Sequence, residues 1–217
     1  MSRKRARELA AKFIEAGDPI GWFEALYAEA QDDPAIVPWA DLKPNPVLVG
    51  WAGKHSIVSK GARAIEIGSG YGDNAEFLAQ LGFGVTAFDI SPTAISVCRR
   101  RFPASKVDYR VADLFEPPPT WSGEFDFALE AYTLQVLPGG LRAAAMKNMA
   151  RLLKPDGSLL VICRGRDESD PKGEMPWPLT RIELEEFVRL GLRIKEFQDF
   201  LDAESPPVRR FLAYYGR

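Results

Sequence analysis

The sequence predicts a doubly wound α/β fold, in which a mostly parallel sheet carries helices on both faces. From residue 62 onward, short apolar β-rich segments alternate with helix-like segments, which is typical of βαβ units. A glycine-rich turn at residues 68–72 joins the first strand to the first helix. Acidic residues close the next two strands, at Asp89 and Asp113. Together these features indicate a ligand-binding sheet edge.

The first elements are helical. Leu9, Phe13 and Ile14 lie at helical spacing and predict a helix over residues 3–16. A second helix is expected over residues 19–30, with a proline in its first position.

A proline-stiffened stretch follows over residues 33–46 and is expected to be extended, with Trp39 exposed. Such a stretch is poor core material and suits a lid. We therefore divide the chain into an N-terminal helical lid, 1–60, and a Rossmann-like domain, 61–217.

The regular part of the chain continues to its end. A capping box at Thr180 and Glu183 starts a helix over residues 180–190. The runs at 192–201 and 208–215 have no helix between them, so we expect an antiparallel pair at one sheet edge. The earlier strands are expected at 63–67, 84–89, 106–111, 125–130 and 157–163, and the helices between them at 73–81, 91–102 and 139–153.

Composition excludes several classes of function. Hydrophobic residues make up 46% and charged residues 27% of the 217, as in an ordinary soluble domain. A net charge of −2 argues against electrostatic binding of nucleic acid or an anionic membrane over a broad surface. No apolar run approaches the ~20 residues that span a bilayer. Two cysteines form neither a disulfide framework nor a zinc site by themselves, so no metal is expected. We expect a cytoplasmic monomer or weak homodimer.

The glycine-rich turn carries the first functional signal. Gly68 and Gly70 lack Cβ, so the turn can be tight and a ligand can lie against bare backbone beside Ser69. The next helix offers free N–H groups at its start, and Glu66 adds a carboxylate just upstream. Taken alone, this pattern also fits an ordinary βα turn.

The acidic strand ends sharpen that signal. Asp89 ends the second strand and can accept hydrogen bonds from both hydroxyls of a ribose. Asp113 ends the third strand and would face the next part of the same ligand. Because doubly wound sheets bind ligands at the carboxyl ends of their strands, we predict a bound nucleoside.

The kind of nucleoside is indicated by Asp73. This residue stands where the dinucleotide fingerprint has its third glycine, beside the diphosphate. A carboxylate there repels phosphate but tolerates a cation. The position disfavours NAD and FAD and favours S-adenosylmethionine, whose sulfonium is positive.

With these residues, the chain resembles the class I S-adenosylmethionine-dependent methyltransferases over about residues 62–165. The resemblance implies a seven-stranded sheet of order 3-2-1-4-5-7-6, strand seven antiparallel, with S-adenosylmethionine as cofactor. The matching segments are the first motif at 66–72, the ribose-binding Asp89, the adenine-contacting Asp113-Leu114, the fourth strand at 125–130 and the turn at 153–159. The cofactor-binding residues implied are Glu66, Gly68, Ser69, Gly70, Asp89, Ile90, Asp113, Leu114 and Glu130.

A narrower resemblance is to the thiopurine and tellurite-resistance methyltransferases. It rests on residues 70–79 and 82–89, on a Trp- and Pro-Asn-Pro-bearing segment at 39–46, and on a Pro-aromatic loop at 175–178. That branch often carries arginine where Asp73 stands, and this departure argues against an anionic acceptor.

Methyl transfer from a sulfonium is an in-line displacement, so the protein mainly aligns the reactants. Orientation alone can contribute ~7–11 kcal/mol. A thiol acceptor needs little else, because its thiolate is substantially present near neutral pH. The one histidine, His55, lies outside the regular strands. Glu130 and Tyr132, just past strand four, are the catalytic candidates, acting by positioning rather than as a base.

The walls of the acceptor site are expected from Trp22, Trp39, Trp177, Arg164 and Arg166. Aromatic walls fit an apolar or heteroaromatic substrate. The arginines either hold a carboxylate or form a loop charge pair, and Trp22 is alternatively a core residue.

The leading hypothesis is methyl transfer to a small-molecule acceptor, with a thiol or other chalcogen preferred. The alternatives are N- or O-methylation of a small molecule or macromolecule, a non-catalytic S-adenosylmethionine-binding module, and a dehydrogenase, which Asp73 disfavours. Methylation of nucleic acid is disfavoured, because nucleic-acid methyltransferases have Asp/Asn-Pro-Pro-aromatic after strand four. This chain has Glu130-Ala-Tyr-Thr at that place.

Overall fold

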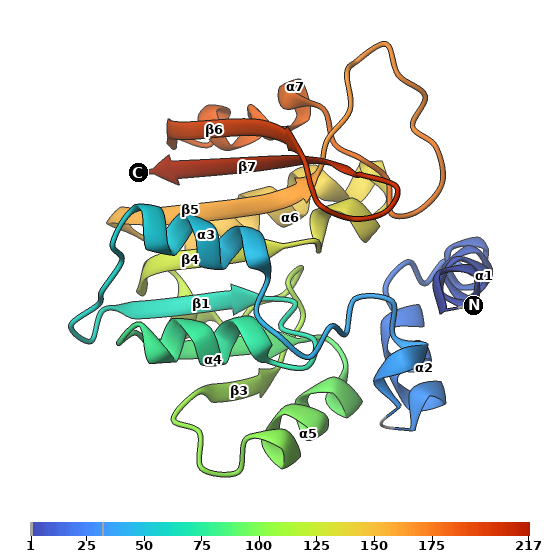
Figure 1. Cartoon of the computed structure of the whole chain (residues 1–217), viewed down its shortest axis with the longest axis horizontal. Helices are drawn as coiled ribbons and strands as arrows, with labels where there is room; N and C mark the ends of the chain where they lie inside the picture. Colours follow the sequence, from blue (N-terminus) through green and yellow to red (C-terminus); the bar gives the residue numbers. More distant parts are fainter. Residues whose placement is uncertain (1, 32) are drawn as a thin grey trace. The chain divides into compact units, whose positions relative to one another are not determined.

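The computed structural model describes residues 2–31 and 33–217 (Figure 1). The helices are α1 (Ser2–Glu15), α2 (Trp22–Ala30), α3 (Pro46–Lys54), α4 (Asp73–Gln80), α5 (Pro92–Arg101), α6 (Gly139–Leu152), α7 (Arg181–Leu184) and α8 (Glu186–Arg189), with 3-10 turns η1 (Pro34–Ile36), η2 (Pro119–Trp121) and η3 (Leu134–Val136). The strands are β1 (Arg63–Ile67), β2 (Gly84–Asp89), β3 (Asp108–Val111), β4 (Phe125–Ala131), β5 (Leu153–Arg164), β6 (Arg193–Leu201) and β7 (Arg209–Gly216).

The strands form a seven-stranded sheet in the order β3-β2-β1-β4-β5-β7-β6. The pairs β1–β4, β2–β3 and β4–β5 are parallel, and β7 is antiparallel to both β5 and β6. The predicted sheet order is therefore confirmed. Strand β7 can run antiparallel because no crossover helix separates it from β6.

Helix α3 was not predicted, and it begins where the proline-stiffened stretch over residues 33–46 was expected to end. Within that stretch, Pro34–Ile36 forms the 3-10 turn η1 instead of extended backbone. The Asn45 side chain accepts a hydrogen bond from the Val47 N–H at 2.9 Å, so it caps the helix, and Pro46 occupies the first turn. Proline is favoured at that position because it has no N–H to leave unpaired. The Asn45 N–H in turn donates to Asn74 Oδ1 at 2.7 Å.

Other helix boundaries differ by a few residues. Helix α2 starts at Trp22 rather than at residue 19, because the Asp18 carboxylate first accepts the Gly21 N–H at 2.9 Å. The predicted capping box of Thr180 and Glu183 is present. The helix that it starts breaks into α7 and α8.

The chain divides into two compact units. The first unit comprises residues 1–61 and 68–113, and the second comprises 62–67 and 114–217. In the first unit, α4 packs on β2, α5 packs on β2 and β3, and α2 packs on α5. In the second unit, α6 packs on β4 and β5, and α8 packs on β6. Within the described part of the chain, no helix combines the length and apolar character needed to cross a membrane.

The N-terminal segment contributes to the core of the first unit. Tyr27 and Val37 are buried in a cluster with Tyr71 of the glycine loop, and Trp39 packs against it. Trp39 is half-buried, and its Nε1–H donates to Tyr27 Oη at 2.7 Å. The expectation that Trp39 is exposed was wrong, because the apolar residues between the prolines bury themselves against helix α5.

A carboxylate joins α2 to the start of α5. Glu24 accepts hydrogen bonds from Ser91 Oγ at 2.5 Å, from Thr93 Oγ1 at 2.7 Å and from the Thr93 N–H at 3.2 Å. Negative charge at a helix N-terminus is favourable because the N–H groups there lack intrahelical partners. Glu24 therefore fastens the N-terminal segment.

Replacing Glu24 tests this attachment. Glu24→Ala removes three hydrogen bonds to a charged acceptor, so we expect a loss of about 1–3 kcal/mol in the free energy of unfolding. Urea denaturation measures it. Glu29→Ala in the same helix is the control, since Glu29 pairs with Arg5 at the surface, and we expect a loss of about 0.5 kcal/mol or less. Equal losses would contradict the assignment.

Candidate functional site

The glycine-rich loop of the first unit has a backbone that only glycine adopts readily. Gly68, Gly70 and Gly72 have φ values of 67°, 53° and 86°, all in the left-handed region. A Cβ on Gly72 would lie 2.6 Å from Tyr109 Oη, and one on Gly70 would lie 3.1 Å from Tyr27 Oη. The loop is therefore held closely between neighbouring side chains, and its three glycines add no side chain of their own.

Asp89, at the end of β2, organises this loop. Its Oδ2 accepts the Gly70 N–H at 2.9 Å, and its Oδ1 accepts the Ser91 N–H at 2.9 Å. Burial raises the pKa of Asp89 to about 6, and the hydrogen bonds from Ser91 and Gly70 oppose that rise. Two carboxylate oxygens have about four acceptor positions. Asp89 can therefore shape the loop and still accept ligand hydroxyls.

Asp73 is paired, which corrects the electrostatic argument against a diphosphate. Both of its oxygens accept hydrogen bonds from Arg101, each at 2.8 Å. Arg101 also donates to the Tyr71 carbonyl at 2.6 Å. The guanidinium compensates the charge of Asp73, so repulsion by this carboxylate does not by itself exclude NAD or FAD.

The remaining predicted cofactor residues follow β2 and β3. In the first unit, Ile90 and Asp113 are half-buried, and the Ala112 N–H donates to the Asp89 carbonyl at 3.1 Å. Ser69 is buried, and its hydroxyl makes no hydrogen bond to a described residue. In the second unit, Leu114 is buried and its carbonyl accepts a hydrogen bond from Asn148 at 2.9 Å.

In the second unit, two carboxylates are buried in β1 and β4, at Glu66 and Glu130. Glu130 Oε1 accepts the N–H groups of Thr133 at 2.7 Å and Leu134 at 2.9 Å. Its Oε2 has no hydrogen-bond partner among the residues described. Burial raises the pKa of Glu130 to about 7, against the lowering effect of those N–H groups. Glu130 is therefore a loop-shaping residue with one oxygen available.

Tyr132 lies two residues beyond Glu130 and has a φ of 72°. This conformation is unusual for a bulky residue. Its N–H donates to the Ile162 carbonyl at 2.9 Å, and the guanidinium of Arg210 lies 4.7 Å from its ring centroid. Tyr132 is thus held at the carboxyl end of β4 from two sides.

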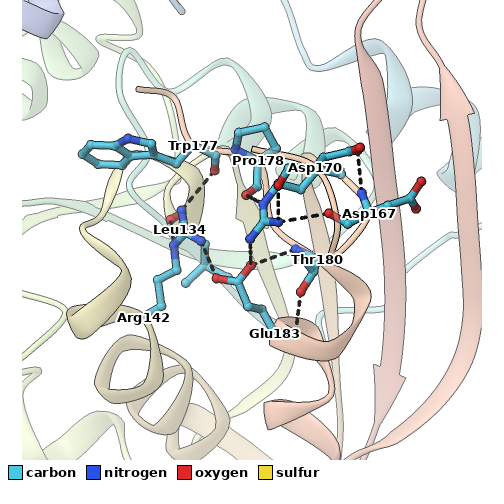
Figure 2. Close-up of polar contacts among 9 residues, drawn as sticks. Leu134, Arg142, Asp167, Asp170, Trp177, Pro178, Thr180 and Glu183 are labelled. Atoms are coloured by element: carbon cyan, nitrogen blue, oxygen red, sulfur yellow. Dashed lines mark hydrogen bonds and ion pairs between the residues drawn. The ribbon is translucent and has the colours of Figure 1, made fainter. Parts of the chain in front are cut away.

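Arg142 anchors the predicted Pro-aromatic loop, as Figure 2 shows. It donates to the Leu134 carbonyl at 3.1 Å, to Glu183 Oε1 at 2.6 Å and to the Trp177 carbonyl at 3.0 Å. The Trp177 indole points away from this network (Figure 2). Sequence reasoning missed Arg142, because a single arginine in a predicted helix carries no signal of burial.

Arg166 belongs to the same network. It lies 3.7 Å from Glu183 and donates to the carbonyls of Pro178, Asp167 and Asp170 at 3.3, 3.0 and 3.1 Å. In this structure Arg166 is a loop anchor, as the loop-charge-pair alternative predicted.

Gln135 connects the same loop to β5. Its side-chain oxygen accepts the Arg164 N–H at 2.7 Å, and its carbonyl accepts the Trp177 N–H at 2.7 Å. The loop after β4 and the Pro-aromatic loop are therefore tied together within the second unit.

Trp22 is fully buried in the first unit. Its ring stacks on Phe23 at a centroid distance of 4.0 Å and meets Trp39 edge-on at 6.0 Å. In this structure Trp22 packs in the core, as the alternative for this residue predicted.

Among the described residues, no group of three or more histidine, cysteine, aspartate or glutamate side chains could hold a metal ion.

Comparison with known proteins adds a family match. Residues 65–161 match the family described as "Methyltransferase domain". The ubiquinone biosynthesis O-methyltransferase of Xanthomonas campestris pv. campestris is 34% identical over 119 residues, which are 54% of this chain and 48% of that protein. The chain thus spans about half the length of this curated relative.

Solved structures share the fold. The Burkholderia thailandensis 1,6-didemethyltoxoflavin-N1-methyltransferase, determined with 1,6-didemethyltoxoflavin and S-adenosylhomocysteine, has a TM-score of 0.69 and 17% identity, covering 100% of this chain and 90% of that one. A TehB-like SAM-dependent methyltransferase from Corynebacterium glutamicum has a TM-score of 0.63 and 20% identity, covering 89% and 97%. The fold is thus shared with a protein described as TehB-like.

Glu130 yields a stability prediction. Since burial raises its pKa to about 7, folding favours the protonated carboxyl. The stability that this preference contributes is complete below the unfolded pKa near 4.5 and is lost as pH rises through 7. Glu130→Gln imitates the protonated form, so we expect it to be more stable than the natural protein by about 1–3 kcal/mol at pH 8, with no gain at pH 4.5.

Urea unfolding at the two pH values measures the difference. Glu116→Gln is the control, because Glu116 is exposed and its replacement should give the same small change at both pH values. A Glu130→Gln effect that does not vary with pH would contradict a buried, proton-binding carboxyl.

Proposed function

We propose that the chain is a class I S-adenosylmethionine-dependent methyltransferase that transfers the methyl group of S-adenosylmethionine to a small-molecule acceptor. The observation that carries the proposal is the family match over residues 65–161, which contains the glycine loop and Asp89. Within the first unit, that loop and that carboxylate are joined by the hydrogen bond from Gly70 to Asp89.

The residues proposed to hold the cofactor fit its chemistry. Asp89 retains acceptor positions for the ribose hydroxyls, and the bare backbone at Gly68 and Gly70 admits close approach. We assign Ile90, Asp113 and Leu114 to the adenosine. Glu66, Ser69 and Glu130 are the other proposed contacts, and the Ser69 hydroxyl can donate because it is not engaged by a described residue.

The bound cofactor supplies an electrophilic methyl group, so the chain's own task is to align the acceptor and exclude water. We propose Trp39, Arg164 and Trp177 as acceptor-site residues. Trp22 supports Trp39 from the core, and Arg166 holds the loop that carries Trp177. Residues 1–60 are proposed to cover the bound ligands as a lid.

For the attacking atom we propose a thiol or another chalcogen. The backbone N–H groups of Thr133 and Leu134 occupy one oxygen of Glu130. The one histidine, His55, ends helix α3, where its ring lies 5.0 Å from that of Trp51. A thiol needs no strong base, since its pKa is near 8.5.

Oxygen methylation is the second candidate. The curated relative from Xanthomonas is named as an O-methyltransferase, and Glu130 has one oxygen without a partner and a pKa of about 7. A base with such a pKa suits proton removal from a hydroxyl near neutral pH. The two candidates differ in whether turnover depends on Glu130.

Cofactor binding tests the central assignment. Asp89→Ala removes the acceptor of the ribose hydroxyls and the anchor of the glycine loop, so we expect the affinity for S-adenosylmethionine and S-adenosylhomocysteine to fall by about 2–4 kcal/mol. Calorimetry measures this change, with NAD as the ligand that should not bind. In the natural protein, affinity should weaken as pH falls through about 6, because the ionised form accepts the hydroxyls.

Asp108→Ala provides the matched control. Asp108 starts β3 and pairs at the surface with Arg110, so its replacement should leave the affinity unchanged. Equal binding by the natural protein and Asp89→Ala would overturn the assignment of Asp89.

Turnover tests the attacking atom. If the acceptor is a thiol, Glu130→Gln should change kcat less than about threefold. If it is a hydroxyl and Glu130 is its base, kcat should fall about 10²–10⁴-fold. A panel of matched thiols, phenols and amines, assayed by formation of S-adenosylhomocysteine, separates these cases. Methylation confined to phenols and abolished in the variant would refute the chalcogen preference.

A further inference from the structure

A buried arginine near the start of β7 makes two ion pairs. Arg210 Nε lies 2.6 Å from Asp202 Oδ2, and its Nη2 lies 2.5 Å from Glu204 Oε1. The Arg210 side chain is 3% exposed. A planar guanidinium with two carboxylate partners is fixed in orientation as well as in position.

Asp202 also organises the loop between β6 and β7, residues 202–208. Its Oδ1 accepts the N–H groups of Glu204 at 3.0 Å and Val208 at 2.9 Å, and its own N–H donates to the Val208 carbonyl at 2.9 Å. Burial acts to raise the pKa of Asp202, but hydrogen bonds from Val208 and Arg210 lower it overall. The carboxylate therefore stays charged and holds Arg210 to a closed loop.

The other side of Arg210 faces Tyr132. The guanidinium carbon lies 4.7 Å from the ring centroid, within the range of a cation–π contact. Tyr132 itself has the strained left-handed φ of 72° and donates its N–H to β5. Strain of this kind persists only where the surroundings enforce it, and it gathers at functional sites. Two consecutive contacts, from Asp202 to Arg210 and from Arg210 to Tyr132, thus connect the 202–208 loop to the carboxyl end of β4.

We propose that Arg210 is a positioning residue for Tyr132 and that the 202–208 loop, acting through Arg210, sets which acceptors the protein takes. The inference rests on the proposed function. Tyr132 directly follows β4 and is, with Glu130, one of the two catalytic candidates that the sequence indicates. Its ring would form one wall of the acceptor site, and the held guanidinium would fix the ring's angle and hence the width of the space left for a substrate.

Arg209 offers a matched comparison within the same strand. Successive strand residues point to opposite faces, and Arg209 also makes two ion pairs, to Asp199 at 2.6 Å and Asp167 at 2.9 Å. Its side chain is 31% exposed and lies over Phe211 rather than Tyr132. If Arg210 had only a structural role, replacing Arg210 and replacing Arg209 would change turnover to a similar extent.

The experiment compares Arg210→Met with Arg209→Met over a graded series of acceptors, from small to bulky. For Arg210→Met we expect the ratio of kcat/KM between bulky and small acceptors to shift at least tenfold, mainly through KM. The Kd for S-adenosylhomocysteine, measured by calorimetry, should stay within twofold. Arg209→Met should shift neither quantity by more than twofold. Arg210→Lys should restore little of the natural ranking, because lysine lacks the planar fork.

Two further variants guard against a folding failure. Tyr132→Leu leaves both ion pairs in place and should reproduce the shift in acceptor ranking. Glu204→Gln weakens only the more exposed pair and should give a smaller shift in the same direction. An unchanged ranking in Arg210→Met, or in these two variants if Arg210→Met does not fold, overturns the inference and leaves the proposed function standing. If the natural protein binds the donor but methylates no acceptor in the series, the proposed function fails, and this inference fails with it.

Discussion

Three loops of this protein depend on carboxylates that accept backbone N–H groups, and two of these carboxylates, Asp89 and Glu130, are buried. Asp89 holds the glycine loop and the residues after β2. Glu130 holds the turn after β4, and Asp202 closes the loop between β6 and β7. A buried charge is costly unless hydrogen bonds compensate it, and an irregular loop has N–H groups that need acceptors. The loop N–H groups compensate the charge of the carboxylate, and the carboxylate oxygens supply the acceptors that those N–H groups need.

This arrangement also lets one residue serve both the structure of a loop and the proposed function. A carboxylate placed at the end of a strand to hold a loop has acceptor positions left over. In Asp89 and Glu130, burial raises the pKa to about 6 and about 7 respectively. Groups with perturbed pKa values near strand ends are candidates for binding and proton transfer. A residue that shapes the backbone can therefore also bind a ligand or move a proton.

The N-terminal segment is integrated into the first unit. Glu24 joins α2 to α5, and Tyr27 packs against Tyr71 of the glycine loop with a ring centroid distance of 5.4 Å. A change in the position of α2 would therefore act directly on that loop through the contact between Tyr27 and Tyr71. This contact gives the proposed lid a physical connection to the backbone that is proposed to bind the cofactor.

The sequence by itself determined the alternation of strands and helices, the glycine turn, and the acidic residues at the end of β2 and shortly after β3. Periodicity, turn chemistry and strand-end charges act over only a few residues. It did not reveal helix α3, whose proline and Asn45 cap also fit an extended stretch. Only the tertiary structure decided the partners of the charged side chains. Arg101 meets Asp73 across 28 positions, and Arg142 meets Glu183 across 41. Such pairs leave no local pattern, because a solvated arginine and a buried one have the same neighbours in sequence, and only packing brings their partners within reach.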